Sequence, residues 1–263
     1  MPKPLQGKVS IVTGASRGIG RGIAIRLAAE GSSVVLCARD QQLLEEAAAG
    51  IRTVGGVAET IALDLRTSDS GQRVVDFAME KFGRIDIVVN NAGATKRGEF
   101  LDLTDEDFAD GFALKFFGSV RLTRAAWPHL KAGGGSVVFI SGVGGRTPGA
   151  QFAIGGSVNA ALLSLTKALA DLGLRDGVQV NCVNPGTIRT ARYTGRLKAL
   201  AKERGLDPEA AEREYVKHAA IARIGEPEDI AALVAFIVDS SGPGGKMLHG
   251  ALIDMDAGAT KTI

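Results

Sequence analysis

A glycine-rich segment near the start of the chain has the residue types and spacing that bind a phosphate group. It reads Thr13-Gly14-Ala15-Ser16-Arg17-Gly18-Ile19-Gly20, directly after a short apolar run and before a helical pattern. Glycines allow a tight turn and a close backbone approach, so a pyrophosphate can rest on the free amides at the N-terminus of the helix. The segment therefore predicts a dinucleotide site.

Lys115 is a candidate for acid–base chemistry because of the residues that flank it. It lies among Leu114, Phe116 and Phe117, where a charge is costly unless the side chain faces a polar cleft. A desolvated ammonium has a lowered pKa and can exchange protons near neutral pH. The alternative is a lysine whose stem packs on the helix while its ammonium reaches solvent.

Short apolar runs alternate with longer helical patterns along the whole chain. Strands are expected at 9–13, 34–38, 57–63, 85–90, 136–141, 178–183 and 248–254. Helices are expected near 18–30, 41–54, 68–82, 104–131, 150–173 and 227–238. This alternation predicts an α/β fold, a doubly wound (Rossmann-type) seven-stranded parallel sheet with helices on both faces.

We expect one dinucleotide-binding domain over 1–263, because the sequence contains no internal repeat and no low-complexity linker. The segment 187–222 is a long excursion between a strand and the last helix. An insertion at the ligand end of a sheet is usually a lid, so this segment predicts a substrate lid within the domain.

The composition argues against several classes of protein. The 263 residues include 31 basic and 29 acidic side chains, for a net charge of +2, so no electrostatic feature favours nucleic acid as a partner. Cys37 and Cys182 lie in apolar runs and are expected to be reduced. Three histidines without ligand spacing predict no metal site. Without a signal-type start or a run near ~18 uninterrupted apolar residues, we expect a cytoplasmic protein with no membrane partner.

Four segments in order resemble the short-chain dehydrogenase/reductase family. Besides the glycine loop, Asp64-Leu65 is similar to the family's adenine-contacting pair and 90–93 to its NNAG turn. Residues 184–190 are similar to the PGxxxT segment that lies along the nicotinamide. The resemblance implies that the cofactor is bound by Gly14, Ser16, Arg17, Gly18, Ile19, Gly20, Arg39, Asp64, Leu65, Asn91, Ala92, Gly93, Pro185, Gly186, Ile188 and Thr190.

The end of the second strand predicts which nicotinamide cofactor is used. Relatives that prefer NAD place an acidic residue there to bind the ribose 2′-hydroxyl, whereas a 2′-phosphate needs cations. Here Ala38 stands at that place, Arg39 follows it and Arg17 approaches from the glycine loop. Asp40 is expected to cap the next helix. We therefore expect NADP(H) rather than NAD.

The family's catalytic residues are missing from their places. Members typically use a Tyr-x-x-x-Lys pair, a Ser thirteen residues before the Tyr, and an Asn on the preceding long helix. Aligning 159–162 with the usual Lys-Ala-Ala-Leu puts Gly155 at the Tyr place and Asn159 at the Lys place. Gly142 then stands at the Ser place and Lys115 at the Asn place. The resemblance therefore implies the fold and the cofactor but not the catalytic mechanism.

Several residues could serve a rebuilt site. Lys115 could exchange the proton, and Asn159 could retain ribose bonding as a neutral donor. Ser141 adjoins the lost Ser place, although strand alternation aims it at the opposite face unless the strand end bulges. The two tyrosines, Tyr193 and Tyr215, both lie downstream of the catalytic helix. Tyr193 is either another proton donor or a packing residue of the lid.

Three functions are consistent with these residues. The first is an NADP(H)-dependent oxidoreductase acting on a carbonyl/alcohol pair through an atypical active site. The second is a catalytically inactive NADP(H)-binding sensor or scaffold. The third is a non-redox lyase or isomerase on the same scaffold.

The lid is rich in cations, which form either a solvated helix face or a site for a carboxylate or phosphate. These cations are Arg189, Arg192, Arg196, Lys198, Lys202 and Arg204. His218 is read as an exposed lid residue. We expect a small-molecule substrate, which is anionic if these cations form a site for a carboxylate or phosphate. The family resemblance of the helices 104–131 and 150–173 and of 256–258 further predicts a homotetramer or homodimer.

Overall fold

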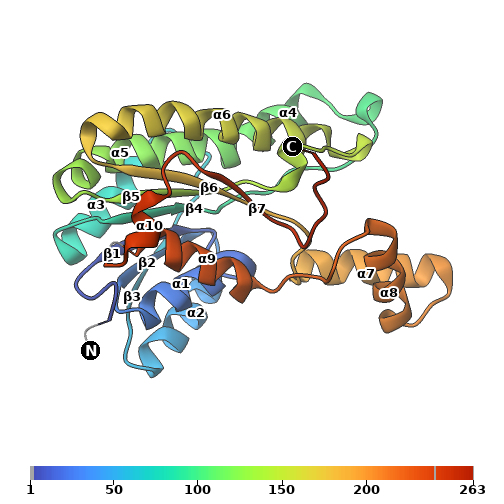
Figure 1. Cartoon of the computed structure of the whole chain (residues 1–263), viewed down its shortest axis with the longest axis horizontal. Coiled ribbons are helices and arrows are strands. Elements are labelled where there is room, and N and C mark those ends of the chain that lie inside the picture. Colours follow the sequence, from blue (N-terminus) through green and yellow to red (C-terminus); the bar gives the residue numbers. More distant parts are fainter. Residues whose placement is uncertain (1–2, 240, 263) are drawn as a thin grey trace.

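The computed structural model describes residues 3–239 and 241–262, which form one Rossmann-type domain around a seven-stranded parallel sheet (Figure 1). The strand order is β3-β2-β1-β4-β5-β6-β7, so the direction of winding reverses between β1 and β4. The strands are β1 (Val9–Thr13), β2 (Ser33–Ala38), β3 (Val57–Ala62), β4 (Ile87–Asn90), β5 (Ser136–Ile140), β6 (Gln179–Pro185) and β7 (Leu252–Met255). The predicted fold class is confirmed.

Helices cover both faces of the sheet, with α5 and α6 above it and α1, α2 and α9 below it as drawn in Figure 1. The helices are α1 (Gly18–Ala29), α2 (Gln41–Thr53), α3 (Ser70–Phe82), α4 (Asp105–Gly111), α5 (Gly118–Gly133), α6 (Ala153–Asp176), α7 (Ala191–Arg204), α8 (Pro208–Ala219), α9 (Pro227–Val238) and α10 (Pro243–Met247). The arrangement follows from strand sequences that are apolar on both sides.

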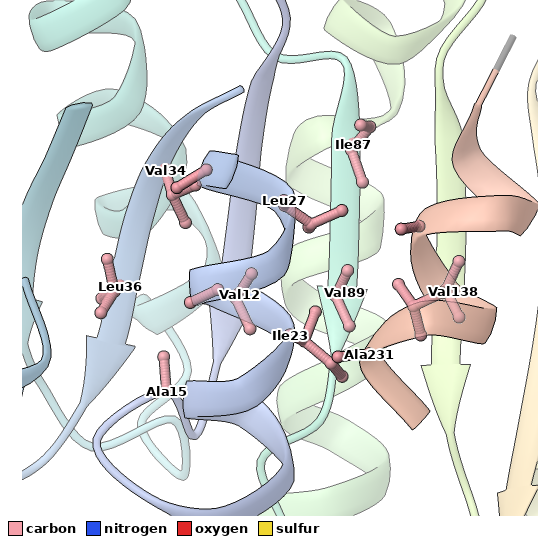
Figure 2. Close-up of a cluster of buried hydrophobic side chains, with 14 of the residues drawn as sticks. Val12, Ala15, Ile23, Leu27, Val34, Leu36, Ile87, Val89, Val138 and Ala231 are labelled. Carbon is pink, nitrogen blue, oxygen red and sulfur yellow. The ribbon is translucent and has the colours of Figure 1, made fainter. Parts of the chain in front are cut away.

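Two clusters of buried apolar side chains hold the helices to the sheet. On one face Val12 of β1 packs with Ile23 and Leu27 of α1 and with Ala231 of α9 (Figure 2). The neighbouring residue Ile11 points to the other face, where α3, α5 and α6 pack. Burying each large aliphatic side chain contributes roughly 1.5–3 kcal/mol, so both faces stabilise the sheet that positions the site.

The expected helix 104–131 is divided into three segments. Thr104 caps α4 in a reciprocal capping box with Asp107, as its sequence indicates. The residues Phe112–Phe117 then form a π-helical turn, and α5 follows from Gly118. This π-helical turn, which the sequence pattern did not predict, contains Lys115.

The last expected strand, 248–254, begins four residues later than predicted. Gly250 adopts a left-handed conformation with φ of 67°, and its amide donates to the carbonyl of Val180. A residue with positive φ turns the chain out of the extended conformation, so the ladder with β6 starts only at Leu252.

Two helices that the sequence pattern did not predict form most of the segment 187–222. We call α7 and α8 together the α7–α8 arm, which projects from the sheet and its covering helices (Figure 1). The arm has its own small apolar cluster, which includes Tyr193, Leu197 and Ala211. Asp207 caps α8 by accepting a hydrogen bond from the amide of Ala210 at 2.8 Å.

The stretch 150–176 is long and apolar enough to cross a membrane when judged by length and composition alone. Most of this stretch is α6, which packs on β6. Its buried residues Val158, Leu162 and Thr166 face the protein interior, so we assign α6 as a covering helix of the sheet.

Candidate active site

The turn between β1 and α1 is built around contacts that leave no room for side chains. Gly14 has φ of 65°, and a Cβ added at Gly20 would collide with the carbonyl oxygen of Gly14. Thr13 Oγ1 accepts hydrogen bonds from the amides of Asn91 and Ala92, each at 3.0 Å. The glycine loop is thereby tied to the end of β4, at the point where the strand order reverses and ligands bind in such sheets.

The N-terminus of α1 has free amides at this crevice. Arg17 occupies the N-cap position in an extended conformation and makes no side-chain capping bond. A Cβ on Gly18 would lie 3.2 Å from Cγ2 of Thr190, so the glycine loop and the segment after β6 face each other. Uncapped helix amides are suited to a pyrophosphate, and the residues present therefore fit a dinucleotide.

The end of β2 agrees with the expected preference for a phosphorylated ribose. Asp40 is occupied as the N-cap of α2, since its carboxylate accepts from the amide of Leu43 at 3.1 Å. Arg17 and Arg39 are exposed. In the described parts of the chain neither has an ion-pair partner. Two guanidiniums without a carboxylate partner can bind a 2′-phosphate.

The Asp64-Leu65 pair lies at the end of β3. The Asp64 carboxylate accepts from the amide of Arg66 at 3.0 Å, and Leu65 is buried. This carboxylate thus orders the turn after β3.

Lys115 of the π-helical turn and Asn159 of α6 are hydrogen-bonded to each other. The ammonium of Lys115 donates to Oδ1 of Asn159 at 2.6 Å and to the backbone carbonyl of Ser141 at 2.8 Å. An ammonium has three N–H donors, so one remains for a ligand. The pKa of Lys115 is lowered to about 8, first by burial and to a smaller extent by the charge of Arg192, whereas a Cys182 thiolate would raise it. A group with this pKa can both give and accept a proton near neutral pH.

Asn159 and Gly142 are also neighbours. A Cβ on Gly142 would stand 3.0 Å from Nδ2 of Asn159, so the amide of Asn159 faces the end of β5. In the described residues this Nδ2 has no hydrogen-bond acceptor, whereas Oδ1 is bound to Lys115. The side chain thus presents one free donor beside the Lys115 ammonium.

Ser141 is near this pair but its hydroxyl is already used. Its Oγ donates to the backbone carbonyl of Asn159 at 3.1 Å, and the side chain is buried. Ser141 therefore joins the end of β5 to α6, and its backbone carbonyl rather than its hydroxyl contacts Lys115.

An aromatic ring fills the space beside Gly155. A Cβ added at Gly155 would collide with the ring of Phe152, and one added at Gly144 would lie 2.6 Å from the same ring. The guanidinium of Arg97 lies over this ring, with Cζ 4.1 Å from the ring centroid. Sequence analysis did not identify Phe152 or Arg97. The available signal was an aromatic residue three positions before Gly155, close to two further glycines.

The remaining predicted residues lie in the α7–α8 arm. Tyr193 is 2% exposed and donates to Glu212. Burial is the first cause that raises its pKa to about 12. Tyr193 therefore packs the arm, the second of the two roles expected for it. His218 lines a small cavity between α7 and α8.

The cations of the arm do not form a single solvated face. Arg189 pairs with Glu212 and Glu226, and Arg204 pairs with Glu214. Arg192 instead reaches toward the crevice, where it donates to the backbone carbonyl of Gly93 at 3.1 Å. Arg189 and Arg204 thus stabilise the arm, and they are not available as free cations.

Comparisons with known proteins agree with this geometry. The short chain dehydrogenase family model matches residues 8–200. An uncharacterized oxidoreductase of Mycobacterium tuberculosis is 36% identical over 97% of this chain and 93% of its own length. The crystal structure of L-sorbose reductase from Gluconobacter frateurii, complexed with NADPH and L-sorbose, superposes with a TM-score of 0.94 at 31% identity and covers 100% of both chains.

A short-chain dehydrogenase from Burkholderia cenocepacia in complex with NADP has a TM-score of 0.82 at 32% identity, over 97% of this chain and 99% of that one. These two neighbours contain the phosphorylated cofactor, in agreement with the expectation drawn from Ala38 and Arg39. The match runs through the glycine loop, the β4 turn and α6 alike. The chain is accordingly an oxidoreductase-type member of the short-chain dehydrogenase/reductase family.

Proposed function

We propose that this protein is an NADP(H)-dependent oxidoreductase that interconverts a carbonyl compound and an alcohol, with Lys115 as the proton donor. The observation that carries the proposal is the Lys115 ammonium, which is held by Asn159 and the Ser141 carbonyl and retains one free N–H. Its pKa of about 8 lies near neutral pH, where a group can both give and accept a proton efficiently.

The active site of this proposal is atypical for the family. The family resemblance implies that Gly155, Gly142 and Asn159 stand at the places of the Tyr, Ser and Lys, and the Phe152 ring is beside Gly155. A phenyl ring has no exchangeable proton, so Phe152 cannot replace a tyrosine hydroxyl in proton transfer. Lys115 is the group that remains within reach of the cleft and can supply the proton.

The cofactor, when bound, supplies or accepts the hydride at the carbon of the substrate. The free amides of α1 would hold its pyrophosphate, and Arg17 and Arg39 its 2′-phosphate. In the direction of reduction Lys115 gives its proton to the substrate oxygen and becomes a neutral amine, which solvent then protonates again. In the direction of oxidation the neutral amine accepts the hydroxyl proton.

Asn159 has two roles in this scheme. Its Oδ1 orients the Lys115 ammonium, and its free Nδ2 can donate to the same substrate oxygen. Two donors that converge on one oxygen stabilise the negative charge that develops there. Ser141 contributes through its backbone carbonyl, as a second acceptor that fixes the lysine.

Lys115→Met tests the proposal once a panel of carbonyl compounds has given a substrate. Loss of a proton-transfer group lowers kcat/KM by a factor of ~10² to 10⁴, while NADPH affinity should stay within a few fold because Arg17 and Arg39 are unchanged. Turnover is followed by NADPH absorbance and binding by its fluorescence. Lys167→Met, an exposed lysine on α6, is the matched control and should retain full activity.

Normal turnover by Lys115→Met would reject the role of Lys115. NADPH binding by the parent protein without turnover of any carbonyl in the panel would instead favour the sensor or scaffold. Conversion of a substrate with no change in NADPH absorbance would favour a lyase or isomerase.

We further propose that 187–222 acts as a substrate lid and that the protein forms a homotetramer or homodimer through α5 and α6. Exposed apolar side chains on these helices, Phe117 beside the start of α5 and Leu174 near the end of α6, support the second proposal, because such side chains commonly pack between subunits. A monomer in light scattering at micromolar concentration would contradict it.

A further inference from the structure

Three arginines from two segments that are far apart in the sequence lie near one another. Arg97 follows the β4 turn, whereas Arg192 and Arg196 lie on α7. Partial burial and then the nearby charge of Arg196 lower the pKa of Arg97. Partial burial and then the charges of Arg196 and Arg17 lower the pKa of Arg192. The three guanidiniums are therefore close enough to repel one another.

No carboxylate compensates this charge within the described ranges 3–239 and 241–262. Of the acidic residues nearby, Glu212 and Glu226 pair with Arg189, Glu214 with Arg204 and Asp107 with Lys96, while Glu99 accepts a hydrogen bond from the side-chain amide of Gln151. Among the described residues, the Arg192 guanidinium forms its hydrogen bond with the backbone carbonyl of Gly93. Like charges held together without counter-charge are unfavourable, whereas the same arrangement binds carboxylates and phosphates strongly.

Two of the three arginines lie close to the residues around Lys115 and Gly155. Arg97 stacks on Phe152, the ring that fills the space beside Gly155. Arg192 binds the carbonyl of Gly93, and a Cβ on Gly93 would lie 2.8 Å from Cδ of Lys115. Gly93 thus accepts from Arg192 through its carbonyl and also lies beside the aliphatic part of Lys115, the proposed proton donor.

The surroundings also provide room for a ligand. A cavity of about 260 Å³ lies between α7 and α8, lined in part by Arg196, Leu200 and Tyr215. An anionic group bound by Arg196 would therefore lie beside this cavity.

We propose that Arg97, Arg192 and Arg196 bind an anionic group of the substrate, so that the substrate is a carbonyl compound bearing a carboxylate or a phosphate. The assignment of a carbonyl rests on the proposed function, but the anion site does not. Arg192 is also near Arg17 of the glycine loop, so a variant of Arg192 could affect cofactor binding as well. Variants of Arg97 and Arg196 are therefore used to test substrate binding alone.

The test is calorimetric titration of the NADP⁺-loaded protein, in which a carbonyl compound cannot be reduced, with oxo-acids of three to ten carbons and with their methyl esters. At least one acid should bind about tenfold or more tightly than its uncharged ester. Arg97→Gln and Arg196→Gln should each weaken that acid by about 10- to 100-fold, the range for charge-assisted hydrogen bonds, and leave its ester unchanged. Lys198→Gln, an exposed cation on the same helix, should change neither.

Competition separates the two anion chemistries. Displacement of the acid by inorganic phosphate at lower concentration than by acetate would assign a phosphate, and the reverse order a carboxylate. Equal affinity for every acid and its ester, or undiminished affinity in both arginine variants, overturns the proposal.

Binding is measured without turnover, so failure of Lys115 as proton donor would leave this result intact. For a substrate that is turned over, Arg97→Gln should raise KM far more than it lowers kcat. An equal fall in kcat for a neutral and an anionic substrate would indicate a structural role for Arg97 and reject the anion site.

Discussion

The half of the molecule around β1 to β4 and the half around β5 to β7 use glycine in opposite ways. At Gly20 the space of a side chain is taken by the backbone of Gly14, which cannot move without opening the turn. At Gly155 the same space is taken by the ring of Phe152, a side chain that can rotate. We call the half around β1 to β4 the nucleotide half and the half around β5 to β7 the catalytic half. Backbone contacts thus fix the shape of the glycine loop in the nucleotide half, whereas side-chain packing determines the space beside Gly155 in the catalytic half.

The polar groups of the two halves differ in the same way. Arg17 and Arg39 stand exposed, and the described residues give them no ion-pair partner. Lys115 is instead enclosed by two acceptors and has a lowered pKa. A surface cation can bind a phosphate in place, but proton transfer needs a group whose surroundings tune its pKa.

The pH dependence of turnover should give the largest effect in the catalytic half. A donor with a pKa of about 8 is protonated below that pH, so carbonyl reduction should be constant below pH 8 and fall about tenfold per unit above it. Alcohol oxidation needs the neutral amine and should rise with pH up to about 8. A flat reduction rate from pH 7 to 10, measured with saturating NADPH, would show that another group donates the proton.

The glycine contrast can be tested directly with two alanine variants. Gly20→Ala forces backbone apart and should cost about 1–3 kcal/mol of unfolding free energy, with a loss of NADPH affinity. Gly155→Ala should cost less, because the half-buried Phe152 ring can swing away. Urea unfolding measures both, and in a Phe152→Ala background the further change Gly155→Ala should cost little, because the ring that its Cβ would meet is gone. Equal costs for the two single variants would remove the distinction between the halves.

Cofactor preference should change by a smaller factor. We expect NADPH to bind at least about tenfold more tightly than NADH, equivalent to about 1.4 kcal/mol. Arg39→Asp should shrink or reverse this ratio, since a carboxylate repels the 2′-phosphate and accepts from a 2′-hydroxyl. Arg124→Asp, at an exposed position on α5, controls for net charge. Similar affinities of the parent for both cofactors would reject the assignment.

The smallest effect is expected in the α7–α8 arm. Tyr193→Phe removes one hydrogen bond to Glu212 and should lower the free energy of unfolding by about 0.5–1.5 kcal/mol. Turnover should stay within about twofold, because the Tyr193 hydroxyl lies inside the arm. A loss of activity as large as that of Lys115→Met would make Tyr193 the proton donor instead.

Sequence alone predicted the nucleotide half well because its rules are local. Apolar runs on both sides of Val12 mark a strand buried on two faces, and the glycine loop sits directly between strand and helix. Asp40 was expected to cap α2 and does so. Each of these features depends on residues a few positions apart, which is the range over which backbone geometry can be read from a sequence.

The catalytic half depends on contacts between distant residues. Lys115 could be suspected from its apolar neighbours, but its contact with Asn159 spans 44 positions. Phe152 fills the space beside Gly155 through the rotamer of a side chain in a short 3₁₀ turn. The helices α7 and α8 were missed because their apolar faces are small and pack mainly on each other.

The direction of the Lys115 side chain depends on the number of residues in the π-helical turn Phe112–Phe117. A π turn contains about one residue more than an α turn, so deleting one residue there would restore regular winding between α4 and α5. Each residue of an α-helix advances the side chain by about 100°. The two helices could therefore keep their packing while the Lys115 ammonium turned away from Asn159. A deletion of one residue in this turn can thus displace the ammonium although Lys115 itself is unchanged.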